Sequence, residues 1–212
     1  MSKPDFISLM AELCSDLPAD ESTPCKIQYF DDYACIIDQK DKVWIKLSSV
    51  RNNVLFTIFS KNIPTHCIGE KTQEKIEGTI LCESDEDAKL CVSAMLTFIE
   101  NGYGEKSHWL IGLDMEDLAT GIFDGTTIKF LHKTFHFSPD EETMKEIKSK
   151  VKDSNVVLAS FMIPDSDSWG YDSLETVSTE ISRELKEEST FWWQISLIEN
   201  IKDWTLDIWY RK

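Results

Sequence analysis

"FWWQISLIENIKDWTLDIWYRK", residues 191–212, holds four of the seven tryptophans of this 212-residue chain. On both sides of residues 199–202, apolar and aromatic side chains recur at every second position, which is the period of a β-strand. The two runs predict a C-terminal β-hairpin in which Phe191 pairs with Tyr210, and the pairing continues from there toward the turn at residues 199–202. One face of this hairpin is then wholly apolar or aromatic and is expected to face the core: Phe191, Trp193, Ile195, Leu197, Trp204, Leu206, Ile208 and Tyr210.

The opposite face of the predicted hairpin is polar except at its open end, where Trp192 would meet Trp209. One interpretation is that the helix expected over residues 172–188, or another loop, covers this pair. The other is a surface that binds a partner, because tryptophan is enriched at interface hot spots. Trp192 and Trp209 are therefore the candidate binding residues.

The rest of the chain alternates strand-like and helix-like patterns. Short β-rich runs separated by turn formers predict an antiparallel meander over residues 25–60. Ser84 can cap a helix that runs to about residue 102, and Ser138, with Pro139 and Glu141 behind it, can cap another. The apolar run of residues 155–164 is typical of a strand that is covered on both faces.

These elements predict an α+β fold with mainly antiparallel sheets, about four helices packed on one side and the C-terminal hairpin. A single domain over residues 1–212 is expected, and a subdomain boundary, if present, would fall at residues 102–107.

The chain is strongly acidic, with 22 Lys and Arg residues against 38 Asp and Glu residues and a formal charge of −16. Such a chain is repelled by phosphate backbones and anionic lipid surfaces, so direct nucleic-acid or membrane binding is not expected. The charge favours a protein partner with a basic or exposed hydrophobic surface. It also leaves open an inhibitor that mimics nucleic acid.

The six cysteines all lie in the first half of the chain and form no Cys-x-x-Cys motif. No apolar run approaches the roughly 18 residues of a membrane span, and no secretory leader is evident. We therefore expect a cytoplasmic protein with reduced thiols.

Motifs for catalysis are weak. His66 and Cys67 are adjacent, and His108 could approach them in space, so these three residues are the only candidates for a hydrolase-type Cys/His site. The sequence has no Gly-rich phosphate loop and no dinucleotide fingerprint, so no cofactor is predicted.

Two patterns suggest metal binding and fail on geometry. His132 and His136 have the spacing of helical ligands, but on a strand they would lie about 13 Å apart. Residues 165–176 begin like a calcium loop, but Trp169 occupies position five, which needs an oxygen ligand, and Thr176 occupies position twelve, which needs a bidentate glutamate. No metal site is predicted.

The order of a helix, several strands and then "KNIP", with "YFDDYACIID" near the start, resembles the opening of the small acidic chaperones of type III secretion over residues 1–64. This resemblance implies a protein-binding role. Together with the charge, it makes a non-enzymatic acidic binding module, such as a chaperone, an inhibitor or an immunity-type neutraliser, the leading interpretation. The Cys/His hydrolase and the nucleic-acid mimic are the alternatives. Oligomeric state is left open.

Overall fold

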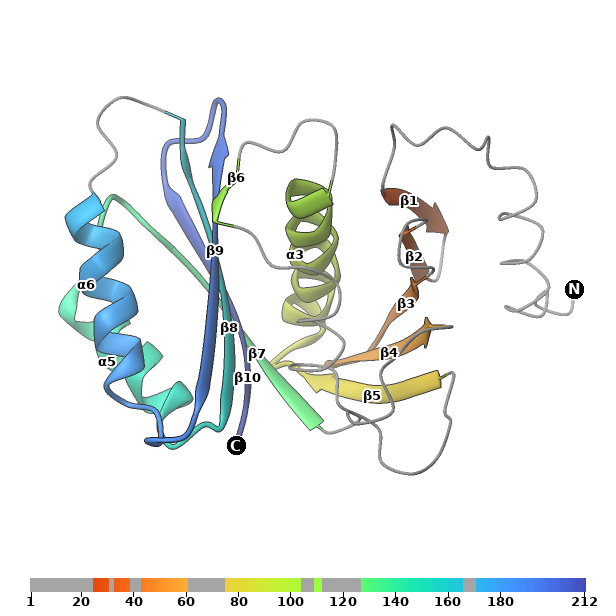
Figure 1. Cartoon of the computed structure of the whole chain (residues 1–212), viewed down its shortest axis with the longest axis horizontal. Helices are drawn as coiled ribbons and strands as arrows, with labels where there is room; N and C mark the ends of the chain where they lie inside the picture. The colour runs from red at the N-terminus through yellow and green to blue at the C-terminus, as the bar shows by residue number, and fades with distance from the viewer. Residues whose placement is uncertain are drawn as a thin grey trace, which may run out of the picture.

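The computed structural model describes residues 25–30, 33–38, 43–60, 75–103, 109–111, 127–165 and 171–212. Within these ranges ten strands form one continuous sheet in the order β1-β2-β3-β4-β5-β7-β10-β8-β9-β6 (Figure 1). The sheet is mixed, because β5 pairs with β7 and β8 pairs with β9 in parallel. Seven of the nine strand pairings in the described ranges are antiparallel, but the predicted antiparallel sheets are corrected to one mixed sheet.

The first half of the sheet is the antiparallel meander that the sequence predicts. Turn formers separate its strands, and each strand pairs with the next. Its members are β1 (Cys25–Phe30), β2 (Tyr33–Asp38), β3 (Val43–Val50), β4 (Asn53–Ser60) and β5 (Lys75–Leu81).

The second half is built around β10 (Trp204–Arg211), which lies between β7 (Thr127–Phe135) and β8 (Val156–Pro164). Its partner in the predicted hairpin, β9 (Thr190–Ile198), pairs instead with β8 and with the short β6 (Trp109–Ile111). The predicted C-terminal hairpin is thus wrong. The alternation that predicted it is nevertheless present, since all eight residues of its apolar face pack in or against a single core cluster.

Three helices accompany this sheet in the described ranges, and they lie on both of its faces (Figure 1). Helix α3 (Asp85–Tyr103) packs on one face, and α5 (Glu141–Val151) and α6 (Tyr171–Ser182) cover the other. The prediction of about four helices on one side is wrong for this reason. Strand β8 is buried along most of its length because its two faces belong to the two different core clusters.

Two predicted helix starts can be compared with the structure. Ser84 caps α3 as predicted, since its Oγ accepts from Asp87 N at 3.0 Å and donates to the Asp87 carboxylate at 2.8 Å. Helix α5 is capped by Asp140 and not by Ser138, because the Asp140 carboxylate accepts from Thr143 N at 2.8 Å. The prediction of one domain over residues 1–212 stays a prediction.

Candidate functional site

The residues that the sequence singled out are not brought together. His66, Cys67 and His108 lie outside the described residues. Trp192 and Trp209 lie in one row on the same face of the sheet, and Leu158 of β8 lies between them. Trp209 is 0% exposed, and its ring contacts Phe98 and Phe130 with centroid distances of 5.9 and 5.4 Å. Helix α3, and not the helix after residue 170, covers this tryptophan.

Trp192 is half-buried and packs at the margin of the same core cluster as Trp209. The two rings therefore do not form the exposed cross-strand pair that a hairpin would have produced. Their role in binding a partner stays a prediction.

A cleft that the sequence did not reveal lies where β5, β7, β10 and the end of α5 meet. It has a volume of about 260 Å³. Its lining is unusual for a chain of charge −16, because it contains three lysines and one glutamate. The lining residues are Leu81, Cys82, Glu83, Lys129, Phe130, Ser149, Lys150, Tyr210 and Lys212.

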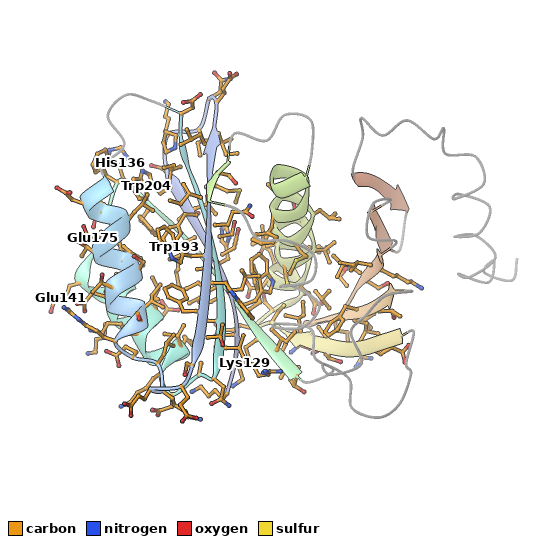
Figure 2. All side chains as sticks on the ribbon, in the orientation of Figure 1. Lys129, His136, Glu141, Glu175, Trp193 and Trp204 are labelled. Carbon is orange, nitrogen blue, oxygen red and sulfur yellow. The ribbon has the colours of Figure 1, made fainter. Side chains whose placement is uncertain are left out.

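The parallel junction of β5 and β7 places Lys129 in the cleft. Lys129 pairs in register with Leu81 on one side and with Tyr210 on the other, so these three side chains share one row and one face of the sheet. Figure 2 shows Lys129 at the lower end of the sheet, opposite the end that carries His136 and Trp204. Tyr210 belongs to the core cluster beneath α5, whereas Leu81 is exposed. The cleft thus marks the border between the covered and the uncovered parts of this face.

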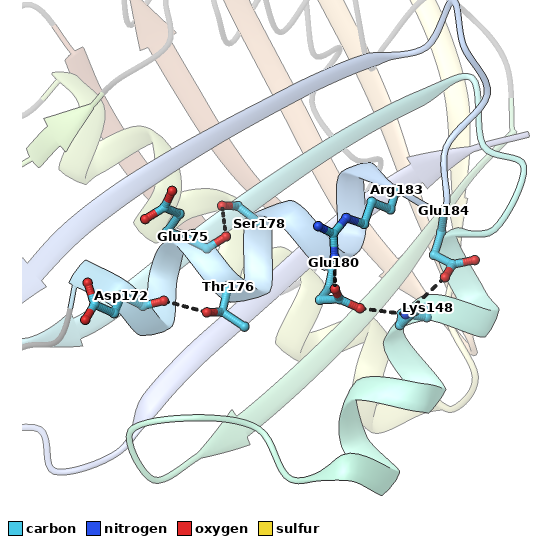
Figure 3. Close-up of polar contacts among 8 residues, drawn as sticks. All are labelled: Lys148, Asp172, Glu175, Thr176, Ser178, Glu180, Arg183 and Glu184. Atoms are coloured by element: carbon cyan, nitrogen blue, oxygen red, sulfur yellow. Dashed lines mark hydrogen bonds and ion pairs between the residues drawn. The ribbon is translucent and has the colours of Figure 1, made fainter.

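Helix α5 supplies Lys150. Ile147 and Val151 are its buried positions. The side chain of Lys148 points instead to α6 and the turn that follows it, where it pairs with Glu180 at 2.7 Å and with Glu184 at 3.2 Å (Figure 3). Lys150, two residues further on, pairs with Glu83 at the cleft. Two lysines of one helix therefore have different contacts: Lys148 pairs with carboxylates at α6, and Lys150 lines the cleft.

The charges in the cleft are only partly compensated. The Glu83 carboxylate raises the pKa of Lys150 above its ordinary value, so this lysine is firmly protonated at neutral pH. Burial raises the pKa of Tyr210, which keeps its hydroxyl protonated as a possible donor. Among the described residues no carboxylate forms an ion pair with Lys129 or Lys212. Chemically, the cleft can accept an anion.

A second polar feature crosses the α3-side face of the sheet as one row of four side chains. Strand register aligns His132, Asp207, Ser160 and Gln194, and the last three are buried. His132 Nδ1 lies 2.7 Å from Asp207 Oδ1. Gln194 donates from Nε2 to the Phe98 carbonyl at 3.2 Å and so links β9 to α3, while its Oε1 accepts from no donor among the described residues. We call these four residues the polar row.

The polar row has a distinctive protonation. The Asp207 carboxylate raises the pKa of His132, and burial raises the pKa of Asp207 while His132 opposes that shift. The direct cause of the raised pKa of His132 is the buried Asp207 carboxylate at 2.7 Å. His136, the other histidine of the predicted metal pattern, instead faces Asp203 at 3.2 Å in solvent. The described residues contain no cluster suited to a metal ion, and part of the calcium-like segment lies outside them.

Comparisons with known proteins give a structural likeness only. No protein-family model matches the sequence, and no curated protein resembles it in sequence. Similar solved structures include a dimer of FtsZ from M. jannaschii, with 16% identity over 60% of this chain and 38% of that one and a TM-score of 0.45. TubZ of Bacillus thuringiensis serovar israelensis has 11% identity over 60% of this chain and 35% of its own, with a TM-score of 0.42.

CetZ2 from Haloferax volcanii has 9% identity over 69% of this chain and 44% of its own, with a TM-score of 0.38. The chain thus covers less than half the length of each of these three proteins. The TM-scores lie below 0.5, so the likeness does not assign an activity to this chain.

These comparisons contradict the leading functional interpretation and put no other activity in its place. The chain had been expected to be a non-enzymatic acidic binding module of the chaperone, inhibitor or immunity type, and the similar structures are of FtsZ, TubZ and CetZ instead. That interpretation and its alternatives are withdrawn. No helix in the described ranges is long and apolar enough to cross a membrane. The cytoplasmic location stays a prediction.

Proposed function

We propose that the cleft between β5, β7, β10 and α5 binds a small phosphate-bearing or carboxylate-bearing ligand. The single observation that supports this function is the gathering of Lys129, Lys150 and Lys212 around one concave site in a chain that is otherwise strongly acidic. Lysine ammonium groups bind phosphate as mobile point charges. The cleft volume of about 260 Å³ suits a small ligand.

The manner of binding follows from the sequence. The chain has no Gly-rich loop whose backbone amides could cradle a phosphate, so side chains must supply the recognition. CetZ2 and TubZ were solved with GTPγS, and that is a property of those proteins. For this chain we propose only the anionic group that the lysines contact and not a particular nucleotide.

Isothermal titration with inorganic phosphate and with a phosphate monoester tests the proposal. Each exposed lysine–phosphate contact contributes up to about 1 kcal/mol, so Lys150→Gln should weaken binding by about fivefold. Glu83→Gln should tighten binding, because it removes the carboxylate that competes for Lys150. Lys148→Gln is the matched control on the same helix, since Lys148 faces α6. Absence of binding, or equal affinities in all variants, would refute the proposed function.

The one protein partner that we propose is a second copy of this chain. The similar FtsZ structure is a dimer and those of CetZ2 and TubZ are protofilaments, which are properties of those proteins. The feature of this chain that favours self-association is a group of three exposed apolar residues, Val50, Leu55 and Leu81. Val50 and Leu81 are the cross-strand partners of Asn53 on its two sides. Leu55 lies two residues after Asn53 on β4, so its side chain is on the same face of the sheet. A basic surface on the partner has no support.

Sedimentation velocity tests self-association. Two copies of charge −16 repel each other, so a dimer held by apolar contacts should strengthen as salt rises. Leu55→Lys should return the protein to monomer, and Leu90→Lys, at another exposed position on α3, is the control. A monomer at every salt and protein concentration would end this second proposal without affecting the first.

A further inference from the structure

The cleft presents hydrogen-bond acceptors as well as lysines, and the proposed function uses only the lysines. Ser149 precedes Lys150 on α5, and both residues line the cleft. The Ser149 hydroxyl donates to the Glu146 carbonyl, three residues earlier on the same helix, at 2.8 Å. A hydroxyl has one proton to donate and two lone pairs with which to accept, so while this bond is in place the Ser149 oxygen can only accept from a ligand.

Glu83 is the second acceptor of the cleft. It lies in the short connection between β5 and α3, its side chain is 61% exposed, and its carboxylate pairs with Lys150 Nζ. A carboxylate offers about four lone-pair sites, so Glu83 can accept a further hydrogen bond without releasing Lys150. Both acceptors are thus next to Lys150, one as its neighbour in the chain and one as its ion-pair partner.

The other two lysines of the cleft belong to the sheet. Lys129 lies on β7 and Lys212 follows β10, and in the ranges that the structure describes neither forms an ion pair with a carboxylate. The cleft is therefore polarised, with uncompensated positive charge on the side of the sheet and acceptors on the side of α5. A ligand that satisfies both sides carries an anionic group and, apart from it, a hydrogen-bond donor.

The charge of the cleft decides between the candidate ligand groups. Three lysines and one glutamate leave the charged side chains of the lining with a net charge of +2. A phosphate monoester carries about −1.5 to −2 at neutral pH and a carboxylate only a single charge, so the phosphate matches the lining more closely. The same positive charge disfavours an ammonium group as the donor, because three lysines repel it and one glutamate attracts it. A neutral hydroxyl has no such penalty.

We propose that the ligand of this cleft is a hydroxylated phosphate monoester, such as a polyol or sugar phosphate, whose phosphate binds the lysines and whose hydroxyl groups donate to Glu83 and Ser149. This inference rests on the proposed function and narrows it from an anionic group to a class of ligand. The lysines supply the affinity for the phosphate, and the two acceptors supply the selection among phosphates.

Isothermal titration with ethyl, hydroxyethyl and aminoethyl phosphate tests the inference in the full-length protein. The three probes share the phosphate and differ in one terminal group, and all are compared above the second phosphate pKa of about 6. Hydroxyethyl phosphate should bind about fivefold more tightly than ethyl phosphate, because its hydroxyl donates to a charged acceptor. Aminoethyl phosphate, whose amine is protonated as that of lysine is, should lack this advantage.

Two variants identify the acceptors, and the readout is the ratio of the hydroxyethyl and ethyl phosphate affinities within each variant. Glu83→Ala should bring the preference for the hydroxyl down to about twofold or less, and Ser149→Ala should lower it by about twofold. Glu86→Ala is the matched control for the first, since Glu86 is an exposed acid of α3 outside the cleft. Ser178→Ala is the control for the second, because Ser178 donates to a carbonyl of its own helix α6, also outside the cleft.

The outcomes separate this inference from the proposed function. Equal affinities of ethyl and hydroxyethyl phosphate, or tightest binding of aminoethyl phosphate, would overturn the inference and leave the anion site intact. Hydroxypropionate, which bears the hydroxyl beside a single negative charge, should bind more weakly than hydroxyethyl phosphate, and equal or tighter binding would overturn the choice of phosphate. A hydroxyl preference that persists in both Glu83→Ala and Ser149→Ala would contradict the assigned acceptors. Absence of binding by every probe would refute the proposed function together with this inference.

Discussion

Asp207 is 1% exposed and holds His132 Nδ1 at 2.7 Å, and this pair should make the stability of the protein depend on pH. The folded state raises the pKa of His132 because the Asp207 carboxylate favours the imidazolium. A raised pKa stabilises the folded protein fully below the ordinary histidine value of 6.5, and this stabilisation is lost as the pH rises through the folded-state pKa. Burial also raises the pKa of Asp207, and this shift lowers stability as the pH rises from the ordinary carboxyl value of 3.8, in a window that begins well below that of His132. The free energy of unfolding should therefore fall as the pH rises above the ordinary histidine value of 6.5.

The magnitude follows from the hydrogen bond itself. His132 is 26% exposed, so solvent screens the pair only partly. A charge-assisted hydrogen bond is roughly twice as strong as a neutral one, so deprotonation of His132 should cost about 1 to 1.5 kcal/mol. In Asp207→Asn the carboxylate is gone and the corresponding pH dependence should disappear, whatever the variant's own stability.

Urea unfolding at a series of pH values measures this effect. The difference between the pH slopes of the wild type and Asp207→Asn isolates the pair from the other titrating groups. Asp203→Asn is the matched control, because it removes the same charge from the solvent-exposed His136–Asp203 pair at 3.2 Å. Equal slopes for the wild type and Asp207→Asn, or a stability that rises over this pH range, would refute the reasoning.

Two further predictions concern the α3 side of the core. Trp209→Ala removes a fully buried ring and its N–H donor to Cys91, so it should lower the free energy of unfolding by about 3–5 kcal/mol. Trp192→Ala should lower it clearly less, because Trp192 is half-buried. Equal losses in denaturant unfolding would contradict the burial assigned to the two rings. Ser84→Ala removes the cap of α3 and should cost about 1 kcal/mol, with Ser93→Ala at an exposed position of the same helix as the control; a variant as stable as the control would show that the cap does not contribute.

The sequence predicts the period of the C-terminal strands correctly and their adjacency wrongly, and the structure shows why. In the predicted hairpin Trp192 would face Trp209 and Gln194 would face Asp207. In the structure both pairs share rows of the sheet, but a β8 residue stands between the partners, so the two backbones are about 10 Å apart. Alternation reports the face on which a residue lies. It does not report which strand lies beside it, because an interposed strand leaves the pattern unchanged.

The parallel pairing of β8 and β9 was missed for a related reason. The chain returns through α6 before β9 begins, and this strand–helix–strand order is the signature of a parallel crossover. The continuous apolar run of β8 already indicated a strand covered on both faces, which places it inside the sheet and makes a simple terminal hairpin less natural.

The cleft could not have been predicted from the sequence. Lys129, Lys150 and Lys212 come from a strand, a helix and the segment after β10, and no local motif links them. Their convergence depends on the parallel β5–β7 junction, which forms between strands separated by α3 and β6 in the chain.

The most direct test of the anion-binding cleft is a map of where phosphate contacts the protein. Backbone amide chemical shifts of the labelled protein would be recorded during titration with inorganic phosphate at low salt. The account predicts shifts that cluster at residues 81–83, 129–130 and 149–150. These shifts should need about fivefold more phosphate in Lys150→Gln and the same phosphate concentration as the wild type in Lys148→Gln. Shifts that spread over the surface, or that cluster elsewhere and persist in Lys150→Gln, would contradict it.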